Sequence, residues 1–190
     1  MTTVSIPAWN ILGVLPPVDP DLPTSPNRSP YPVSLKDVVM RFSTSSARRK
    51  VLEGLLDYRK ALHRIGLMSG FQWLDGSFLE DVETIERRDP RDIDVVTFLH
   101  TSDAFSVTDE DALILDAETT KERFSVDGYI VELDAVTPRE LTIWSAYWYS
   151  LWSHRRNQAW KGFLQIELAP EEDDDARNML AQYDMAGGVL

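Results

Sequence analysis

Proline is distributed unevenly along this chain, and that distribution limits where regular structure can form. Eight of the eleven prolines fall within residues 1–33. Proline lacks a backbone N–H and fixes φ, so this segment is expected to form neither a helix nor a central strand. It still carries six apolar side chains: Trp9, Ile11, Leu12, Val14, Leu15 and Tyr31. We therefore predict an extended arm over 1–33, packed on a domain over 34–190 that includes an acidic C-terminal run at 171–175.

Beyond the arm, the apolar residues follow two different periods. Helical spacing or capping signals predict helices over 34–42, 47–66, 77–84 and 108–124, from Pro138 onward, and after the acidic run. Apolar runs predict strands over 71–74, 93–99, 126–136 and 163–168. Helices that alternate with strands predict the α/β class, with a mixed sheet of four to five strands and helices packed on it.

The composition excludes several classes of protein and of site. The 190 residues and the 43% hydrophobic content are typical of one globular domain. The chain has no cysteine, which excludes disulfides, thiolate zinc sites and cysteine nucleophiles and favours a reducing cytoplasm. No apolar run reaches the roughly 18 residues of a transmembrane helix, and the N-terminus lacks signal-peptide features. We expect a cytoplasmic protein without a membrane partner.

The charge balance limits the choice of partners. The formal net charge is −12, which repels nucleic-acid phosphate at long range. General DNA binding is therefore not expected. A nucleotide held through a divalent metal ion is compatible with this charge, because the ion supplies the positive charge.

One short region combines carboxylates with a glycine-containing turn. Asp92 and Asp94 are two residues apart at the start of a predicted buried strand, so their side chains point to the same face. Mg²⁺ is commonly bound by one or two carboxylates together with phosphate oxygens and waters. Gly76 lets a backbone approach a ligand closely, and Ser77 adds a hydroxyl at the end of the preceding strand. The alternative is that the acids merely cap the wet end of a strand.

The order Gly76-Ser77, then Asp92-Ile93-Asp94 on a strand, resembles the signature of the nucleotidyltransferase superfamily, which has the polymerase-beta-like fold. Four further stretches resemble an uncharacterised bacterial family of nucleotidyltransferase-like proteins; they are Leu15-Pro16-Pro17, Gln72-Trp73-Leu74-Asp75-Gly76-Ser77-Phe78, Ser153-His154-Arg155-Arg156 and Trp160-Lys161-Gly162-Phe163. This wider resemblance covers most of the chain. It implies the nucleotidyltransferase fold and transfer of a nucleoside monophosphate from a nucleoside triphosphate to an acceptor.

The resemblance also implies roles for individual residues. Asp92 and Asp94 would hold Mg²⁺ or Mn²⁺, and Gly76 and Ser77 would hold the triphosphate. A third acid on a later strand would complete the metal site. Asp127 is favoured for this position because it opens the predicted strand, and Asp134 is the alternative. Strand parity puts Asp127 and Asp134 on opposite faces.

Two clusters in the C-terminal half have alternative interpretations. Arg155, Arg156 and Lys161, with His154, form a dense basic group. They either neutralise the triphosphate or form a solvated helix end, where cations suit the helix dipole. The second cluster is an aromatic stripe on the predicted helix: Trp144, Tyr147, Trp148, Tyr149 and Trp152. We expect this stripe to pack in the core rather than to stack on bases.

By analogy with small solitary members of the superfamily, the acceptor would be a protein or a transfer-RNA end, in a toxin–antitoxin or phage-defence system. The alternative is a catalytically degenerate module of the same fold that binds a nucleotide or a protein partner. Small members of the superfamily usually have a second glycine or a basic residue shortly after Gly-Ser. This chain instead has Phe78-Leu79-Glu80-Asp81, which favours the alternative.

Overall fold

A computed structural model describes residues 3–19, 21–101 and 105–185. Residues 1, 2 and 20 of the predicted arm, and residues 102–104 and 186–190 of the predicted domain, lie outside the described residues. The described chain contains a five-stranded mixed sheet in the order β1-β5-β2-β3-β4, which confirms the predicted α/β class. The strands are β1 Tyr31–Pro32, β2 Ser69–Asp75, β3 Ile93–His100, β4 Val126–Glu132 and β5 Leu164–Glu167.

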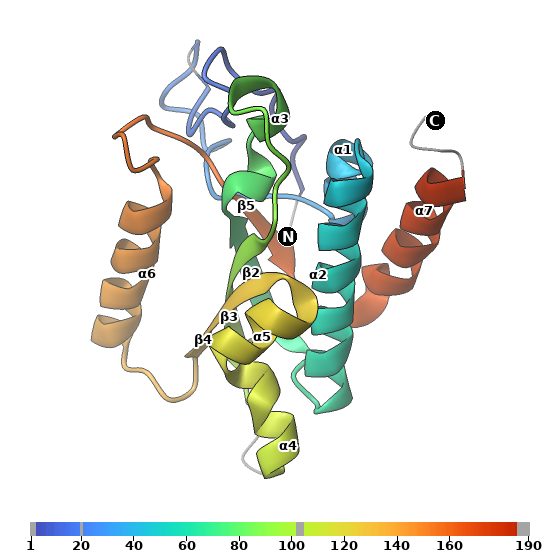
Figure 1. The fold of residues 1–190 in the computed structure, drawn as a ribbon. Helices are drawn as coiled ribbons and strands as arrows, with labels where there is room; N and C mark the ends of the chain where they lie inside the picture. The colour runs from blue at the N-terminus through green and yellow to red at the C-terminus, as the bar shows by residue number, and fades with distance from the viewer. Residues whose placement is uncertain (1–2, 20, 102–104, 186–190) are drawn as a thin grey trace.

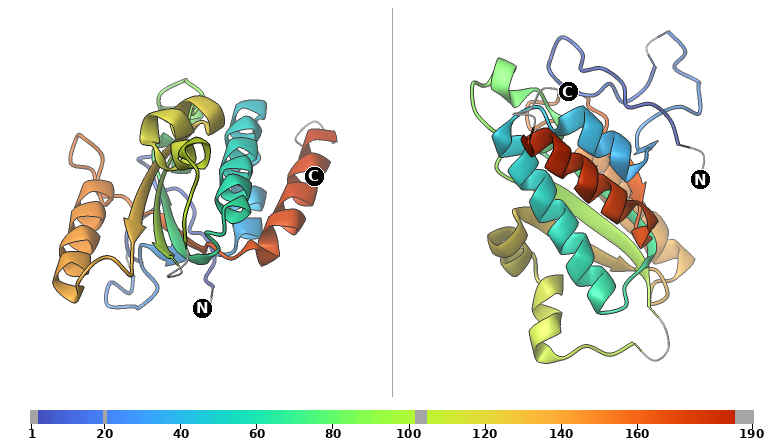
Figure 2. Two further views of the ribbon diagram at one scale, coloured as in Figure 1. Left: turned by 90° about the horizontal axis from the view of Figure 1, so that it is seen from below. Right: turned by 90° about the vertical axis from the view of Figure 1, so that its right-hand side faces the viewer.

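Helices cover both faces of this sheet (Figure 1). The helices are α1 Leu35–Phe42, α2 Ser46–Arg64, α3 Val82–Ile85, α4 Asp109–Ala112, α5 Ala117–Phe124, α6 Pro138–Trp152 and α7 Asp173–Met185, with short 3₁₀ turns at η1 Ser77–Leu79, η2 Leu113–Leu115 and η3 Pro170–Glu172. Helices α1, α2 and α7 lie together on one face, and α6 lies alone on the other (Figure 2).

Local hydrogen bonds explain where the predicted helices begin and break. Ser34 and Thr137 cap α1 and α6 as predicted, and Thr137 forms a full capping box with Glu140. The predicted helix 108–124 is divided, because Asp116 is extended and its side chain accepts a hydrogen bond from the Thr119 N–H, which starts α5. The predicted helix 77–84 is likewise interrupted at Glu80, whose backbone is extended.

The register of the central strands places acidic residues in one row. Strand β2 is antiparallel to β3, and β4 is parallel to β3. Asp75 lies opposite Asp94, and Asp94 lies opposite Asp127. Residues that lie opposite each other in neighbouring strands point to the same face of the sheet. The end of β2 and the starts of β3 and β4 therefore bring three carboxylates to one edge of the fold.

The N-terminal arm packs along the domain for part of its length. Val14, Leu15 and Tyr31 are buried, and the Trp9 Nε1–H donates to the Leu79 carbonyl at 2.7 Å. Ile11 is 95% exposed and Leu12 is 49% exposed, so these two of the six apolar residues do not pack as predicted. The arm ends in β1, whose pairing with β5 extends the sheet.

Hydropathy gives one negative result for the described part of the chain. Among residues 3–19, 21–101 and 105–185, no helix is both long enough and apolar enough to span a bilayer.

Candidate active site

Three carboxylates converge where β3 and β4 begin. Asp94 and Asp127 are opposite one another in the sheet, and Asp92 precedes Asp94 by two residues. Burial and, after it, the negative charges of Asp127 and Asp92 together raise the pKa of Asp94 to about 6. Such mutual repulsion favours the binding of a cation between them.

A lysine lies among these carboxylates. The Lys121 Nζ from α5 is 3.1 Å from Asp92 Oδ2 and 3.0 Å from Asp127 Oδ2. Both contacts raise the pKa of Lys121, and the hydrogen bond to Asp127 has the larger effect. Within the described residues, no group of three or more histidine, aspartate or glutamate side chains is arranged to hold a metal ion.

The donor set nevertheless fits a hard divalent cation once the ammonium moves. Carboxylate oxygens are the ligands that Mg²⁺ and Mn²⁺ prefer, and Asp92, Asp94 and Asp127 all line one cavity. The Lys121 side chain is about half exposed at 49%, so its flexible stem has room to withdraw. The ammonium and a metal ion would thus compete for the same two carboxylates.

The turn after β2 lies directly against this group. Gly76 has a φ of 89°, and a Cβ at this position would lie 3.1 Å from the Asp94 carboxylate. A side chain here would therefore be strained and would crowd Asp94. Ser77 follows and lines the same cavity, and the Arg88 Nη1 lies 3.5 Å from the Ser77 Oγ.

The predicted basic cluster is only partly available to a ligand. The Lys161 Nζ donates to both oxygens of Asp75, at 2.8 and 2.7 Å, and lies 3.3 Å from Glu80. The Arg155 Nε donates to Glu80 at 2.8 Å. Burial raises the pKa of Asp75 and Lys161 counteracts this increase in part, so that the pKa is about 7. By contrast, Arg156 is exposed at the rim of the cavity.

Because of these ion pairs, neither interpretation describes the whole basic cluster. Lys161 is 6% exposed, so it is not part of a solvated helix end. Its partner Asp75 immediately precedes Gly76, and Glu80 belongs to the acidic segment after Ser77. The acidity of that segment therefore balances the basic cluster.

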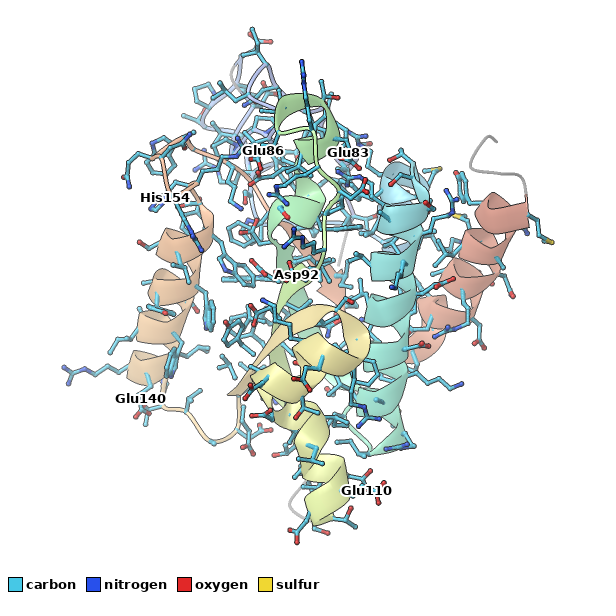
Figure 3. The ribbon with its side chains drawn as sticks, viewed as in Figure 1. Glu83, Glu86, Asp92, Glu110, Glu140 and His154 are labelled. Carbon is cyan, nitrogen blue, oxygen red and sulfur yellow. The ribbon has the colours of Figure 1, made fainter. Side chains whose placement is uncertain are left out.

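The cavity that contains all of these groups has a volume of about 740 Å³. This is within the about 300–1,000 Å³ typical of small-molecule sites. Figure 3 shows Glu86 and His154 toward one end of the molecule, Asp92 near its middle, and Glu110 and Glu140 toward the opposite end. The site thus lies where α6 ends and β3 and β4 begin.

The structure separates the two candidates for the third acid. Asp127 lies with Asp92 and Asp94, whereas Asp134 follows the far end of β4. There Asp134 accepts hydrogen bonds from His100 at 2.9 Å and from the Thr101 N–H at 2.9 Å. The His100 hydrogen bond lowers the pKa of Asp134.

Residues that line the cavity but were not predicted as part of the site include Arg88, Lys121, Tyr129 and Trp148. Local sequence patterns indicate two of these residues. Lys121 is in the last turn of the helix that precedes the Asp127 strand, and Tyr129 shares the strand face of Asp127. Arg88 lies in a connection between elements, and its approach to Ser77 depends on tertiary structure.

Comparison with known proteins places the chain in a family. Residues 7–167 match the "Family of unknown function (DUF6932)". No curated protein and no solved structure matches the chain significantly. The matched residues include the arm from Pro7, the whole carboxylate group and the basic cluster. Because the match covers most of the chain, this protein belongs to the family DUF6932.

Proposed function

We propose that this protein is a metal-dependent nucleotidyltransferase, which transfers a nucleoside monophosphate from a nucleoside triphosphate to an acceptor hydroxyl. The observation that carries the proposal is the convergence of Asp92, Asp94 and Asp127 beside the Gly76-Ser77 turn. An alternative strand-cap role would leave the acids apart on a wet surface. Here they repel one another in a cavity of nucleotide size.

In the proposed mechanism, the carboxylates divide the metal ligation. Asp92 and Asp94 would hold Mg²⁺ or Mn²⁺ near the triphosphate. Asp127 would help to hold metal near the acceptor hydroxyl. Bound metal would neutralise the phosphate charge and the charge that develops on the attacking and leaving oxygens. The acceptor oxygen would bond to the α-phosphorus, and pyrophosphate would leave.

The other residues of the cavity would orient the triphosphate. Gly76 leaves space beside Asp94, and the Ser77 hydroxyl lies next to the Arg88 guanidinium. Arg88 and Arg156 line the cavity and are both exposed at its rim, so each can move to meet phosphate oxygens. Lys161 acts indirectly in this proposal, because its pairing with Asp75 fixes the strand end that precedes Gly76.

A second candidate function is a nucleotide-binding or partner-binding module of the same fold without catalysis. The position of Lys121 favours it, because an ammonium between Asp92 and Asp127 satisfies the carboxylates without a metal ion. The two functions differ in whether this ammonium yields to Mg²⁺ or Mn²⁺ when a nucleotide is present.

A labelling assay tests the proposal. Purified protein is incubated with each nucleoside triphosphate labelled at the α-phosphate, with Mg²⁺ or Mn²⁺, and with the protein and transfer-RNA fractions of a cytoplasmic extract. We expect label on one fraction, consistent with a cytoplasmic acceptor. Asp127→Asn should abolish the label while nucleotide binding persists, and Asp134→Asn should retain it.

The same assay, combined with calorimetry, separates the two candidates. Nucleotide binding without label on any fraction, with either metal, would support the non-catalytic module. Label that survives in Asp127→Asn but is lost in Asp134→Asn would overturn the assignment of the third acid.

A further inference from the structure

Helix α6 and the edge strand β4 enclose a second, apolar groove. Its volume is about 390 Å³, within the about 300–1,000 Å³ of small-molecule sites. None of the residues that line it is charged; they are Tyr129, Ile130, Val131, Val136, Trp144, Tyr147 and Trp148. An uncharged planar ring suits such a lining better than a charged group does.

The aromatic stripe of α6 is divided between core and groove, which corrects the expectation that it packs in the core. Trp148 and Trp152 are buried against the sheet, whereas Trp144 is 43% exposed and Tyr147 is 51% exposed. The aromatic stripe is wider than the part of α6 that packs against the sheet. Exposed aromatic rings in a hollow provide stacking surfaces.

The rings of the groove already contact one another. Tyr129 and Trp148 have their centroids 4.8 Å apart, and Tyr147 packs edge-on against Trp148 at 5.1 Å. Trp144 continues the series, at 6.0 Å from Tyr147. A ring that enters the groove therefore meets several aromatic surfaces together.

The groove adjoins the carboxylate cavity. Tyr129 and Trp148 line both spaces. Tyr129 also follows Asp127 by two residues in β4, so both side chains lie on the same face of the strand. One molecule can thus place a charged end among the carboxylates and an apolar end in the groove.

Trp148 carries a second, independent indication of a ligand. Its side chain is buried at 6% exposure, and its indole N–H finds no acceptor among the described residues. An unsatisfied buried donor is unfavourable, and native proteins rarely leave one unless a ligand or water completes it. Every nucleobase carries a ring nitrogen or carbonyl that can accept this hydrogen bond.

We infer that this groove binds the nucleobase of the nucleoside triphosphate whose phosphates lie in the carboxylate cavity. The base stacks on the exposed rings of Trp144 and Tyr147 and accepts a hydrogen bond from the Trp148 N–H. The inference rests on the proposed function, because that function supplies the triphosphate. Residues shared by the two cavities favour a single molecule over separate ligands.

Calorimetry with three probes and Mn²⁺ tests the inference: a non-hydrolysable ATP analogue, inorganic tripolyphosphate and adenosine. We expect the analogue to bind at least tenfold more tightly than tripolyphosphate. The double substitution Trp144→Ala/Tyr147→Ala should weaken the analogue about tenfold and leave tripolyphosphate unchanged, since base–aromatic stacking is lost. Trp160→Ala is the matched control, because Trp160 is exposed but lines neither space.

Trp148→Phe tests the hydrogen bond separately, because phenylalanine keeps a ring but removes the N–H. We expect weaker binding of the analogue and of adenosine, with unchanged tripolyphosphate binding and a cooperative melting transition. Equal binding of the analogue by all groove variants would overturn the inference, even if tripolyphosphate still binds.

Other outcomes identify other occupants and also overturn the inference. Adenosine that binds together with the analogue would show that the groove holds a base of the acceptor. Self-association that Trp144→Ala/Tyr147→Ala abolishes would show that a second copy of the chain covers it. If neither the analogue nor tripolyphosphate binds with Mn²⁺, the proposed function itself fails.

Discussion

Two charged groups, one on each face of the sheet, are balanced in opposite ways. On the face covered by α2 and α7, Arg59 is fully buried and every part of its guanidinium has a partner. On the face covered by α6, the Lys121 ammonium bridges Asp92 and Asp127, and the charges of these two carboxylates raise the pKa of Asp94. A closed network holds elements together, whereas an excess of like charge is retained at a cost and indicates a ligand.

The closed network on the α2 face connects distant parts of the chain. Arg59 donates to Asp173 at 2.6 Å, to the Gln72 side chain at 2.7 Å and to backbone carbonyls at and just after the end of β5. It thereby joins α2, β2 and the start of α7. Its expected role is structural, because its hydrogen bonds leave no group directed to a cavity.

The largest expected effect on stability comes from breaking this network. Arg59→Ala should lower the free energy of unfolding by roughly 3–5 kcal/mol, because it leaves Asp173 and several carbonyls without their partner. Urea unfolding measures the change. Arg177→Ala is the control, since its contact with Asp57 is exposed and such pairs contribute about 0–1 kcal/mol. Equal effects of the two substitutions would remove the contrast between the faces.

An opposite effect is expected on the α6 face. The pKa of Asp94 is raised from 3.8 to about 6, so between these values the folded state binds more protons than the unfolded state. This contribution to stability therefore falls as pH rises from about 4 to about 6. Asp94→Asn should stabilise the metal-free protein at pH 8 by roughly 1–3 kcal/mol.

Thermal melting at pH 5 and pH 8 checks this prediction. Added Mn²⁺ should stabilise the wild type at pH 8 and have less effect on Asp94→Asn, because a ligand that binds the folded state raises its stability. A variant that is less stable than the wild type at pH 8, without metal, would show that Asp94 contributes a net favourable interaction.

A smaller effect is expected from Lys121. Replacing it by methionine removes the ammonium that competes with a metal ion at Asp92 and Asp127. Two such contacts contribute up to about 2 kcal/mol, so Mn²⁺ affinity should rise roughly tenfold. Lys60→Met on α2 makes the same change in net charge at an exposed position and should have little effect. Unchanged or weaker Mn²⁺ binding in Lys121→Met would mean that the lysine does not compete with the metal ion for these carboxylates.

Sequence reasoning succeeded where the signal was local. The caps Ser34 and Thr137 begin α1 and α6, and the apolar run after Asp92 is β3. The same-face spacing of Asp92 and Asp94 follows from strand geometry alone. The position of Asp127 opposite Asp94 agrees with the preference for it, although the register itself depends on strand pairing.

It failed where long-range pairing decides the outcome. Lys161 belongs to a basic run in the sequence, yet it pairs with Asp75, which is 86 residues away. Lys121 and Asp92 come from different elements, so the spacing of residues in the sequence does not predict their contact. The division of the aromatic stripe depends on how much of α6 the sheet covers, which periodicity does not specify.

The most direct test of the central claim is a crystal structure with Mn²⁺ and a non-hydrolysable nucleoside triphosphate. The anomalous signal of manganese identifies the ion independently of the model of the site. We predict a peak between Asp92 and Asp94, with the Lys121 Nζ displaced from Asp92 and Asp127. An ordered site without an anomalous peak at saturating Mn²⁺, with Lys121 still bridging the carboxylates, would contradict a metal-dependent transferase.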